Sequence, residues 1–245
     1  MSLSAAGATA LRVLTQLRRD PRTIVLIVGV PCLLEALLKE LFSGRSAVFQ
    51  HVGAPLLGLF PFVSMFVVTS VTMLRERTSG TLERLMTMPL GKLDLLAGYG
   101  AAFAFVAAVQ ATVVSTLAFG LLGLHVEGPR WAVVALAVGN ATLGMSLGLL
   151  VSAFATTEFQ AVQFMPAVVF PQMLLCGLFV ARADMAEWLR YISDGLPLTY
   201  AYDALARVAS GGPYATRFGA DVAVTLGAVL VALALAAATL RRRTP

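Results

Sequence analysis

One pattern in this sequence has the form of a serine nucleophile. Gly144-Met145-Ser146-Leu147-Gly148 matches Gly-x-Ser-x-Gly, in which a histidine removes the proton of the serine. The two histidines, His51 and His125, both fall near the predicted outer side of the membrane, so no base is expected beside Ser146. The glycines also form a small-xxx-small pair, which in membrane helices marks close packing. We therefore expect a helix contact at Gly144 and Gly148 rather than an intramembrane protease.

No nucleotide or metal site is expected on the chain itself. Gly91-Lys92-Leu93 lacks the upstream glycine and the serine or threonine of a phosphate-binding loop. Cys32 and Cys176 lie in apolar segments and have neither the spacing of metal ligands nor that of a disulfide framework. The prediction is a chain without cofactor or metal, and active transport by it would need an energy source on another protein.

Composition assigns the chain to the membrane proteins. Of its 245 residues, 58% are hydrophobic and 13% are charged, and the mean hydropathy is +0.84. A soluble domain carries roughly 25% charged residues. Most of the chain must therefore cross a bilayer, which leaves no room for a sizeable soluble catalytic domain. The net charge of +5 follows membrane orientation, and no nucleic-acid partner is expected.

Uncharged stretches long enough for a spanning helix divide the chain into six predicted spans. A charge at the centre of a span costs roughly 2.5 to 3.5 kcal/mol, so the confinement of nearly all charges to the connections supports the boundaries. In the first span Glu35 interrupts the apolar run, one helical turn before Lys39. The predicted fold is an all-α polytopic membrane protein, a single transmembrane domain over residues 1–245. The spans are 23–42, 55–74, 95–123, 131–155, 159–180 and 220–240.

Lysine and arginine residues predict the orientation of the spans. They are more numerous on the side that contains both termini, and cytoplasmic connections carry this excess. Both termini are therefore expected in the cytoplasm. The basic residues assigned to that side are Arg12, Arg18, Arg19, Arg22, Arg75, Arg77, Arg84, Lys92, Arg241, Arg242 and Arg243.

Residues 1–22 are expected to form an amphipathic elbow helix on the inner membrane surface. Asp20-Pro21 ends its pattern, and a frayed basic tail is the alternative. We expect this segment to be retained, because the apolar run that follows it reaches no small-residue cleavage site. The apolar face is assigned to Leu3, Leu11, Leu14 and Leu17, and the polar face to Arg12, Gln16 and Arg18.

The connection at 75–92 is expected to contain a short amphipathic helix in the cytoplasm. Leu82, Leu85 and Met86 recur at helical spacing, Thr78 or Ser79 can cap the start, and Pro89 ends the run. An exposed helix with an apolar stripe suits docking into a groove on a cytosolic partner. A helix lying on lipid fits the same periodicity, and both interpretations stay open.

The connection at 182–212 is too apolar for a solvated loop and too interrupted for a span. We expect re-entrant or interfacial helices there, on the outer side. Trp188, Tyr191, Tyr200 and Tyr202 could equally form an interfacial aromatic belt.

Polar residues inside the spans are candidates for a substrate path. Asn140, Gln160 and Gln163 are expected to face the bundle interior or a partner, because lipid does not hydrate them. Hydrogen bonds between helices are the alternative role for them. Gln110 and Gln172 fall in the same class.

The loop after the second span resembles a known signature. The stretch Glu76-Arg77 through Gly80-Thr81-Leu82-Glu83-Arg84-Leu85, with Pro89 downstream, is similar to the cytoplasmic loop of the type-2 ABC exporter permeases, particularly the bacterial drug-resistance branch typified by daunorubicin export. The order of Arg19-Asp20-Pro21, Thr157-Glu158-Phe159-Gln160-Ala161 and Leu196-Pro197-Leu198-Thr199-Tyr200 extends the resemblance over essentially the full length. Departures from the family pattern, at Gly98-Tyr99, Cys176, Glu187 and Leu196, lie outside the loop signature.

This resemblance implies a permease subunit of an ATP-driven exporter in the bacterial cytoplasmic membrane. The implied cargo is hydrophobic or amphipathic, such as a drug, an antibiotic or a lipid-like molecule. Two copies of a cytosolic ABC ATPase would hold ATP and magnesium, and a second permease, identical or related, would complete the assembly in the membrane lipid. The family's coupling contacts map to Glu76, Gly80, Thr81, Leu82, Glu83 and Arg84. Its outer cap over the exit maps to Trp188, Pro197 and Tyr200.

Two other functions remain open at this point. A permease of the same architecture could export a lipid-linked glycan or a lipid. A membrane-anchored assembly or immunity factor could share the fold and transport nothing.

Overall fold

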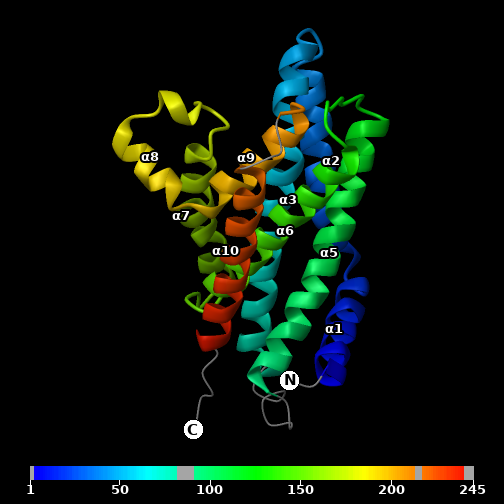
Figure 1. The fold of residues 1–245 in the computed structure, drawn as a ribbon. Coiled ribbons are helices and arrows are strands. Elements are labelled where there is room, and N and C mark those ends of the chain that lie inside the picture. Colours follow the sequence, from blue (N-terminus) through cyan, green and yellow to red (C-terminus); the bar gives the residue numbers. More distant parts are fainter. Residues whose placement is uncertain (1–2, 82–90, 213–216, 240–245) are drawn as a thin grey trace.

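The computed structural model describes residues 3–81, 91–212 and 217–239, and all of the regular structure in these ranges is helical (Figure 1). Four of these helices are long and apolar enough to cross a membrane: α3, α5 from Asp94, α6 and α10. The chain is therefore an all-helical protein with several spans. The helices are α1 (Leu3–Arg18), α2 (Pro21–Leu41), α3 (Ser46–Thr78), α5 (Lys92–Gly120), α6 (Arg130–Val151), α7 (Glu158–Leu175), α8 (Glu187–Asp194), α9 (Pro197–Ala209) and α10 (Arg217–Thr239), with a short 3₁₀ turn at Arg182–Asp184.

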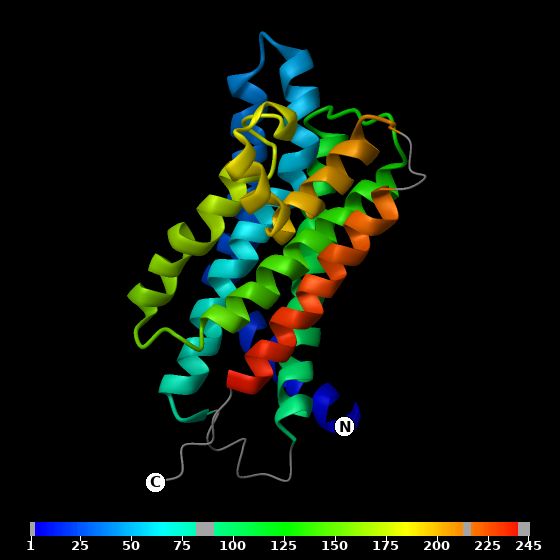
Figure 2. The ribbon, with the colours of Figure 1, turned by 60° about the vertical axis from the view of Figure 1, so that its left-hand side comes forward.

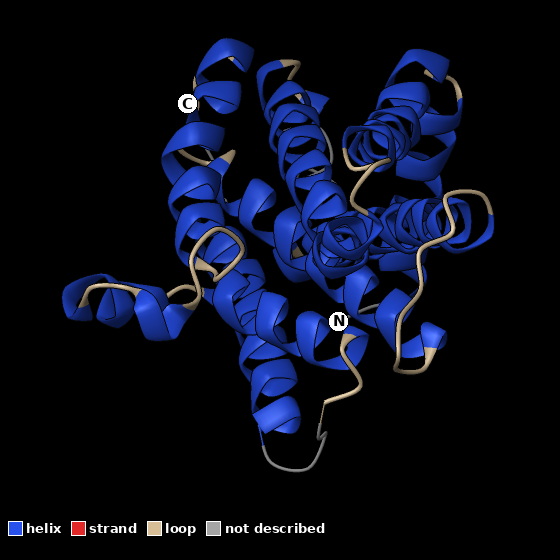
Figure 3. Cartoon of the chain, turned by 90° about the horizontal axis from the view of Figure 1, so that it is seen from above, coloured by secondary structure: helices blue, strands red, loops and turns tan. Residues whose placement is uncertain are grey.

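The long helices run up and down in alternation around a central pair, α3 and α6 (Figures 1 and 2). We call the end that holds α1 and the last turn of α3 the inner end, and the end that holds α8 and α9 the outer end. The connection between α2 and α3 projects furthest at the outer end (Figure 1). Viewed from above, some helices are seen close to end-on and others run obliquely across the view (Figure 3).

The central helices meet at glycines, in the α3–α6 seam formed by Phe62, Phe66, Thr69, Gly144 and Gly148. A Cβ on Gly144 would lie 2.1 Å from the carbonyl oxygen of Phe62, and one on Gly148 would lie 2.4 Å from that of Phe66. Both helices step forward by four residues, so they run parallel at a small-xxx-small contact. The expected packing role of Gly144 and Gly148 is confirmed.

A proline in α2 explains one buried polar contact. Pro31 has no N–H, so the carbonyl of Ile27 loses its normal helical donor. The side chain of Gln110 on α5 replaces it, with its Nε2 donating to the Ile27 oxygen at 2.7 Å and to Ser64 Oγ at 3.0 Å. Gln110 therefore satisfies a backbone group and ties α5 to α2 and α3.

The charged residues of α2 do not pair with each other. Lys39 lies with its ammonium 5.1 Å from the centre of the Phe49 ring. Glu35 is fully buried, and neither carboxylate oxygen has a hydrogen-bond partner among the described residues. Although Glu35 and Lys39 are one helical turn apart, they do not meet, and the carboxyl group of Glu35 has no partner among the described residues.

Helix α1 packs along α5 with a face that differs from the expected one. Val13 and Thr9 are buried in this contact, and Leu14 and Leu17 pack beside them. Leu11, expected on the apolar face, is 68% exposed. Arg12, expected on the polar face, turns inward because a buried carboxylate on α3 lies opposite it.

Candidate functional site

The last turn of α3 carries an ion pair that joins three helices at the inner end. Arg12 Nη1 on α1 lies 3.2 Å from Glu76 Oε1 on α3, and Arg12 Nη2 donates to the hydroxyl of Tyr99 on α5. The guanidinium also lies over the Tyr99 ring, 5.5 Å from its centre. We call Arg12, Glu76 and Tyr99 the inner charge cluster.

Burial makes this cluster a strong link. The Glu76 side chain is 9% exposed and Tyr99 is fully buried, whereas the Arg12 side chain keeps 28% of its surface. A buried carboxylate is costly unless a cation and hydrogen bonds compensate its charge. Arg12 supplies both, so the position of Glu76 depends on α1.

A glycine lets α1 approach α5 closely enough to form the cluster. A Cβ on Gly98 would lie 2.5 Å from the Thr9 Cβ and 2.7 Å from the carbonyl oxygen of Ala6. Only a residue without a side chain fits there. Gly98, together with Tyr99, which departs from the family pattern, therefore forms the surface that receives α1.

The residue before Glu76 points the other way. Arg75 forms a two-pronged pair with Glu158 at the start of α7, with Nε to Oε1 at 2.7 Å and Nη2 to Oε2 at 2.9 Å. Both side chains are more than half exposed. Hydrogen bonds from Arg75 hold the pKa of Glu158 below its usual value. The end of α3 is thus linked to α1 and α5 on one face and to α7 on another.

Helix α3 ends in a turn that favours glycine. Ser79 caps the helix, with its N–H donating to the Arg75 oxygen at 2.9 Å, and Gly80 follows at φ +72°. Among the described residues, no atom lies within 4 Å of a Cβ built on Gly80, and its positive φ is the feature that opposes larger residues. The Ser79 and Thr81 hydroxyls lie 2.9 Å apart.

The predicted coupling residues therefore fall into three groups. Glu76 is inside α3 and faces the bundle, while Gly80 and Thr81 follow the end of the helix. Leu82, Glu83 and Arg84 lie outside the described residues, as does most of the expected coupling helix.

Because α3 has 33 residues, it is about 50 Å long, well beyond the roughly 30 Å of a bilayer core. A force applied at Gly80 would act directly on the inner end of this long helix.

An arginine organises the outer end. Arg182 pairs with Asp194 at the end of α8 and, at 2.8 Å, with Asp203 on α9. Ser193 Oγ donates to the carbonyl of Leu175 at 2.8 Å, which ties α8 to the end of α7. Arg207 on α9 lies 3.8 Å from Asp221 on α10.

The three residues assigned to the outer cap differ in their surroundings. Tyr200 donates its hydroxyl to the carbonyl of Asp194 at 2.7 Å, and Pro197 occupies the first turn of α9, where a missing N–H costs nothing. Trp188 on α8 is 64% exposed. Two of the three are thus parts of the local framework, and Trp188 presents an aromatic surface outward.

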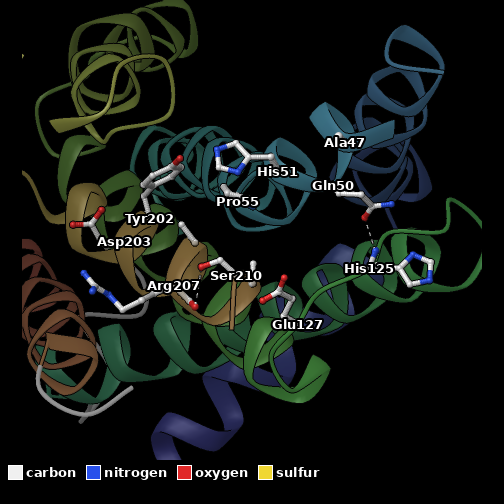
Figure 4. Close-up of a pocket in the computed structure, with 12 residues that line it drawn as sticks. Ala47, Gln50, His51, Pro55, His125, Glu127, Tyr202, Asp203, Arg207 and Ser210 are labelled. Carbon is white, nitrogen blue, oxygen red and sulfur yellow. Dashed lines mark hydrogen bonds between the residues drawn. The ribbon is translucent and has the colours of Figure 1, made fainter. Parts of the chain in front are cut away.

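A pocket of about 550 Å³ opens at the outer end between α9, the start of α3 and the α5–α6 connection (Figure 4). His51 and His125 both line it, and the side-chain oxygen of Gln50 accepts a hydrogen bond from the backbone N–H of His125 at 2.6 Å.

Ser146 is buried in the middle of the bundle, where its hydroxyl donates to the carbonyl of Leu143. The described residues contain no group of three metal-binding side chains. The arrangement offers neither a Ser-His pair nor a metal centre in the described part of the chain.

The three candidate path residues do not converge. Asn140 is buried on α6 and packs so closely on Gly58 that a Cβ there would lie 2.3 Å from its amide nitrogen. Gln160 accepts hydrogen bonds from the N–H and hydroxyl of Thr156, both at 2.9 Å, and helps to begin α7. Gln163 is exposed on α7.

Sequence reasoning missed the partners that hold these residues. Arg12 and Tyr99 lie 64 and 87 residues from the groups they meet, and no local pattern connects them. Arg182 likewise gave no signal as the centre of the outer end. Glu35 did give one, since it interrupts an apolar run, and a buried ionisable group in a membrane helix is a functional candidate by default.

Comparisons with known proteins agree with the loop signature. A family model described as ABC-2 type transporter matches residues 6–208. The probable multidrug ABC transporter permease YbhR of Escherichia coli (strain K12) is 29% identical over 157 residues, which are 62% of this chain and 42% of that protein. The linearmycin resistance permease protein LnrN of Bacillus subtilis (strain 168) is 24% identical over 168 residues, 69% of this chain and 42% of that protein.

A relative also occurs in Dictyostelium discoideum. The ABC transporter G family member 20 of Dictyostelium discoideum is 29% identical over 147 residues, which are 60% of this chain and 20% of that protein. The matched part of this chain thus corresponds to less than half the length of each of these relatives.

Proposed function

The chain belongs to the ABC-2 type transporter family, and we propose that it is the permease subunit of an ATP-driven exporter. The family match over residues 6–208, which confirms the resemblance of the loop signature, is the observation that carries this proposal. Membership makes the chain an integral membrane transport subunit and not an enzyme in itself.

The energy source is proposed to be a separate ABC ATPase, because the family works in ABC transporters. Two ATPase subunits would bind ATP and magnesium and would dock at the inner end. A second permease, identical or related, would complete the pore. We expect no nucleotide on this chain, since the sequence lacks a phosphate-binding loop.

The proposed cargo is a hydrophobic or amphipathic drug, antibiotic or lipid-like molecule. The names of two bacterial relatives, a probable multidrug permease and a linearmycin resistance permease, support this class and support a location in a bacterial cytoplasmic membrane. An exporter of lipid-linked glycans would share the inner end and differ in its cargo. A non-transport assembly or immunity factor would lack an ATPase partner.

We propose six spans, with α2 and α7 added to the four candidate spans. Both helices present large apolar side chains outward, as a lipid-facing surface requires, including Leu26 and Leu33 on α2 and Phe170 and Leu174 on α7. Both termini would then be cytoplasmic, α1 would lie at the inner interface, and α8 and α9 would form the outer cap with Trp188, Pro197 and Tyr200.

Coupling is proposed to pass from the ATPase through Gly80 into α3. Closure of the ATPase subunits would push on Thr81, Leu82, Glu83 and Arg84, and Glu76 would transfer the displacement to α1 and α5 through Arg12 and Tyr99. The α3–α6 seam would carry it to the centre of the bundle. Asn140, Gln160 and Gln163 are proposed to line or border the path between permeases.

Co-purification tests the proposal most simply. The chain is isolated in mild detergent from its native membrane, and the ATPase activity of the associated proteins is measured. We expect a stoichiometric ATP-binding subunit that is lost or weakened in Glu83→Lys and retained in Glu187→Lys, a matched charge reversal at the outer end. If the chain purifies without any associated ATPase, that result would contradict the proposed exporter function and favour the non-transport function.

Gly80 provides a second test that separates docking from coupling. Gly80→Ala forces a side chain into a left-handed backbone, whereas Gly80→Asn is tolerated better there. We expect both variants to bind the ATPase and only Gly80→Ala to lose export by about tenfold. Equal export by the two variants would exclude the turn at Gly80 from the coupling path.

A further inference from the structure

A narrow apolar groove lies at the inner end between α1, α2 and α5. Its walls include Leu14 and Leu17 of α1, Ile24 and Val28 of α2, and Val109 of α5, and its volume is about 170 Å³. Arg18 is the charged side chain that lines it. Ile24 and Val109 are 37% and 44% exposed, so the groove opens on the outer surface of the bundle.

Three arginines gather at the elbow between α1 and α2, where this groove ends. Arg18 is the last residue of α1, Arg19 follows it, and Arg22 is in the first turn of α2. All three are exposed, and none forms an ion pair within the described ranges. Arg12 and Arg75, in contrast, are each paired with a glutamate.

The nearby acidic residue does not neutralise the three arginines. Asp20 accepts hydrogen bonds from the N–H and hydroxyl of Thr23, at 3.2 and 2.6 Å, and caps α2. These bonds hold the pKa of Asp20 below its usual value, so its carboxyl group is ionised at neutral pH. The elbow still has an excess of positive charge next to an apolar groove.

We propose that this groove binds an anionic phospholipid of the inner leaflet. One acyl chain would occupy the apolar walls, and the phosphate would meet Arg18, Arg19 and Arg22. Guanidinium groups match phosphate oxygens in charge and in two-pronged geometry. A zwitterionic lipid has the same acyl chain, but its choline group offsets the charge of the phosphate. A free phosphate has the charge but no acyl chain. The joint presence of groove and arginines therefore selects an anionic lipid.

Binding is tested on the purified, delipidated full chain in mild detergent, with native mass spectrometry as the readout. Dioleoyl phosphatidylglycerol is compared with dioleoyl phosphatidylcholine, which has the same chains. We expect the anionic lipid to bind about tenfold more tightly or better. Glycerol 3-phosphate, a headgroup without chains, is expected not to compete at the same concentration.

Variants divide the site into its two parts. The triple variant Arg18→Gln, Arg19→Gln, Arg22→Gln should lose the preference for the anionic lipid. Val109→Trp, which fills the groove from an exposed position, should weaken both lipids without a change in charge. The matched control removes three exposed arginines of the outer end, Arg45→Gln, Arg130→Gln and Arg190→Gln, and should retain the preference. A thermal unfolding midpoint for each variant verifies that it is folded.

The proposal is overturned by any of three results. Equal binding of the two lipids, an equal loss in the control variant, or competition by glycerol 3-phosphate would each show that the groove and the elbow arginines do not form one site. The measurement uses neither ATP nor an ATPase, so its outcome is independent of export.

Discussion

Helix α3 is held in two different ways along its length. At the α3–α6 seam, glycines bring the backbone of α6 against carbonyl groups of Phe62 and Phe66. At the inner end, charged side chains reach from α3 to other helices, with Glu76 on Arg12 and Arg75 on Glu158. The first region holds two backbones together, and the second joins helices through long side chains.

The difference indicates how motion would travel through the protein. Backbone contact at a glycine seam does not tolerate displacement of one helix along the other, because any shift separates the helices or makes atoms overlap. Charged side chains can change rotamer and exchange partners with water, so helices joined by them can tilt or rotate. We infer that displacement enters α3 at its inner end and that the seam moves as a rigid unit.

Filling the seam is the largest expected perturbation. Gly144→Leu would drive a side chain into the carbonyl of Phe62, and we expect a loss of stability of about 4 kcal/mol or failure to accumulate in the membrane. Gly139→Leu on the same helix is the control, because no atom of the described residues lies within 4 Å of a Cβ there. Denaturation in mixed micelles compares the two, and equal stability would contradict the seam.

Breaking the inner charge cluster is expected to cost less. Glu76→Gln leaves Arg12 without its anion, and we expect a loss of about 2–3 kcal/mol, below the full cost of a buried pair because Arg12 is 28% exposed. The double variant with Arg12→Gln should lose less than the sum of the single variants. Additive losses would mean that the two groups do not depend on each other.

Breaking the uncharged hydrogen bond between Gln110 and Ile27 is expected to cause an intermediate loss of stability. Gln110→Leu removes the donor that serves the Ile27 carbonyl, and we expect a loss of about 1–2 kcal/mol. Pro31→Ala returns an N–H to α2, so the double variant should regain most of that stability. A double variant no more stable than Gln110→Leu alone would exclude this explanation of Gln110.

Breaking the exposed ion pair between Arg75 and Glu158 is expected to cause the smallest loss of stability. Arg75→Gln should change the free energy of unfolding by about 0.5 kcal/mol, because both Arg75 and Glu158 are more than half exposed. A loss as large as that of Glu76→Gln would remove the contrast between the two faces of α3.

The same pair has a defined pH dependence. Because Arg75 lowers the pKa of Glu158, its contribution is present above the ordinary glutamate pKa of about 4.3 and is lost as pH falls through the lower value of the folded state. The stability difference between wild type and Arg75→Gln should therefore shrink in acid and stay constant near neutral pH. A difference that grows in acid would contradict this sign.

The sequence predicts the long elements well and the contacts between them poorly. Gaps between charges indicated the long helices because charge is costly in a membrane, and the spacing of Gly144 and Gly148 predicted their contact. The inward turn of Arg12 was not predictable, because its partner lies 64 residues away. Helical periodicity assigned Arg12 to a polar face, but a buried carboxylate reversed that preference.

The proposed coupling residues were predicted from the family resemblance and only partly from physical reasoning about the sequence. The sequence indicated an amphipathic stretch after Gly80, and its helical spacing is a local property. The left-handed turn at Gly80 and the inward position of Glu76 depend on where α3 ends, four residues later than the predicted span. Helix ends are set by tertiary contacts that a single sequence does not contain.

Export by Glu76→Gln is the direct test of coupling through the inner charge cluster. The variant is reconstituted with the proposed ATPase partner in proteoliposomes, and ATP hydrolysis and export are measured together, with Arg75→Gln as the neighbouring control. We predict that the complex with Glu76→Gln still hydrolyses ATP but loses most export, whereas Arg75→Gln exports at close to the wild-type rate. Normal export by Glu76→Gln in a folded, ATPase-bound complex would contradict coupling through the inner charge cluster.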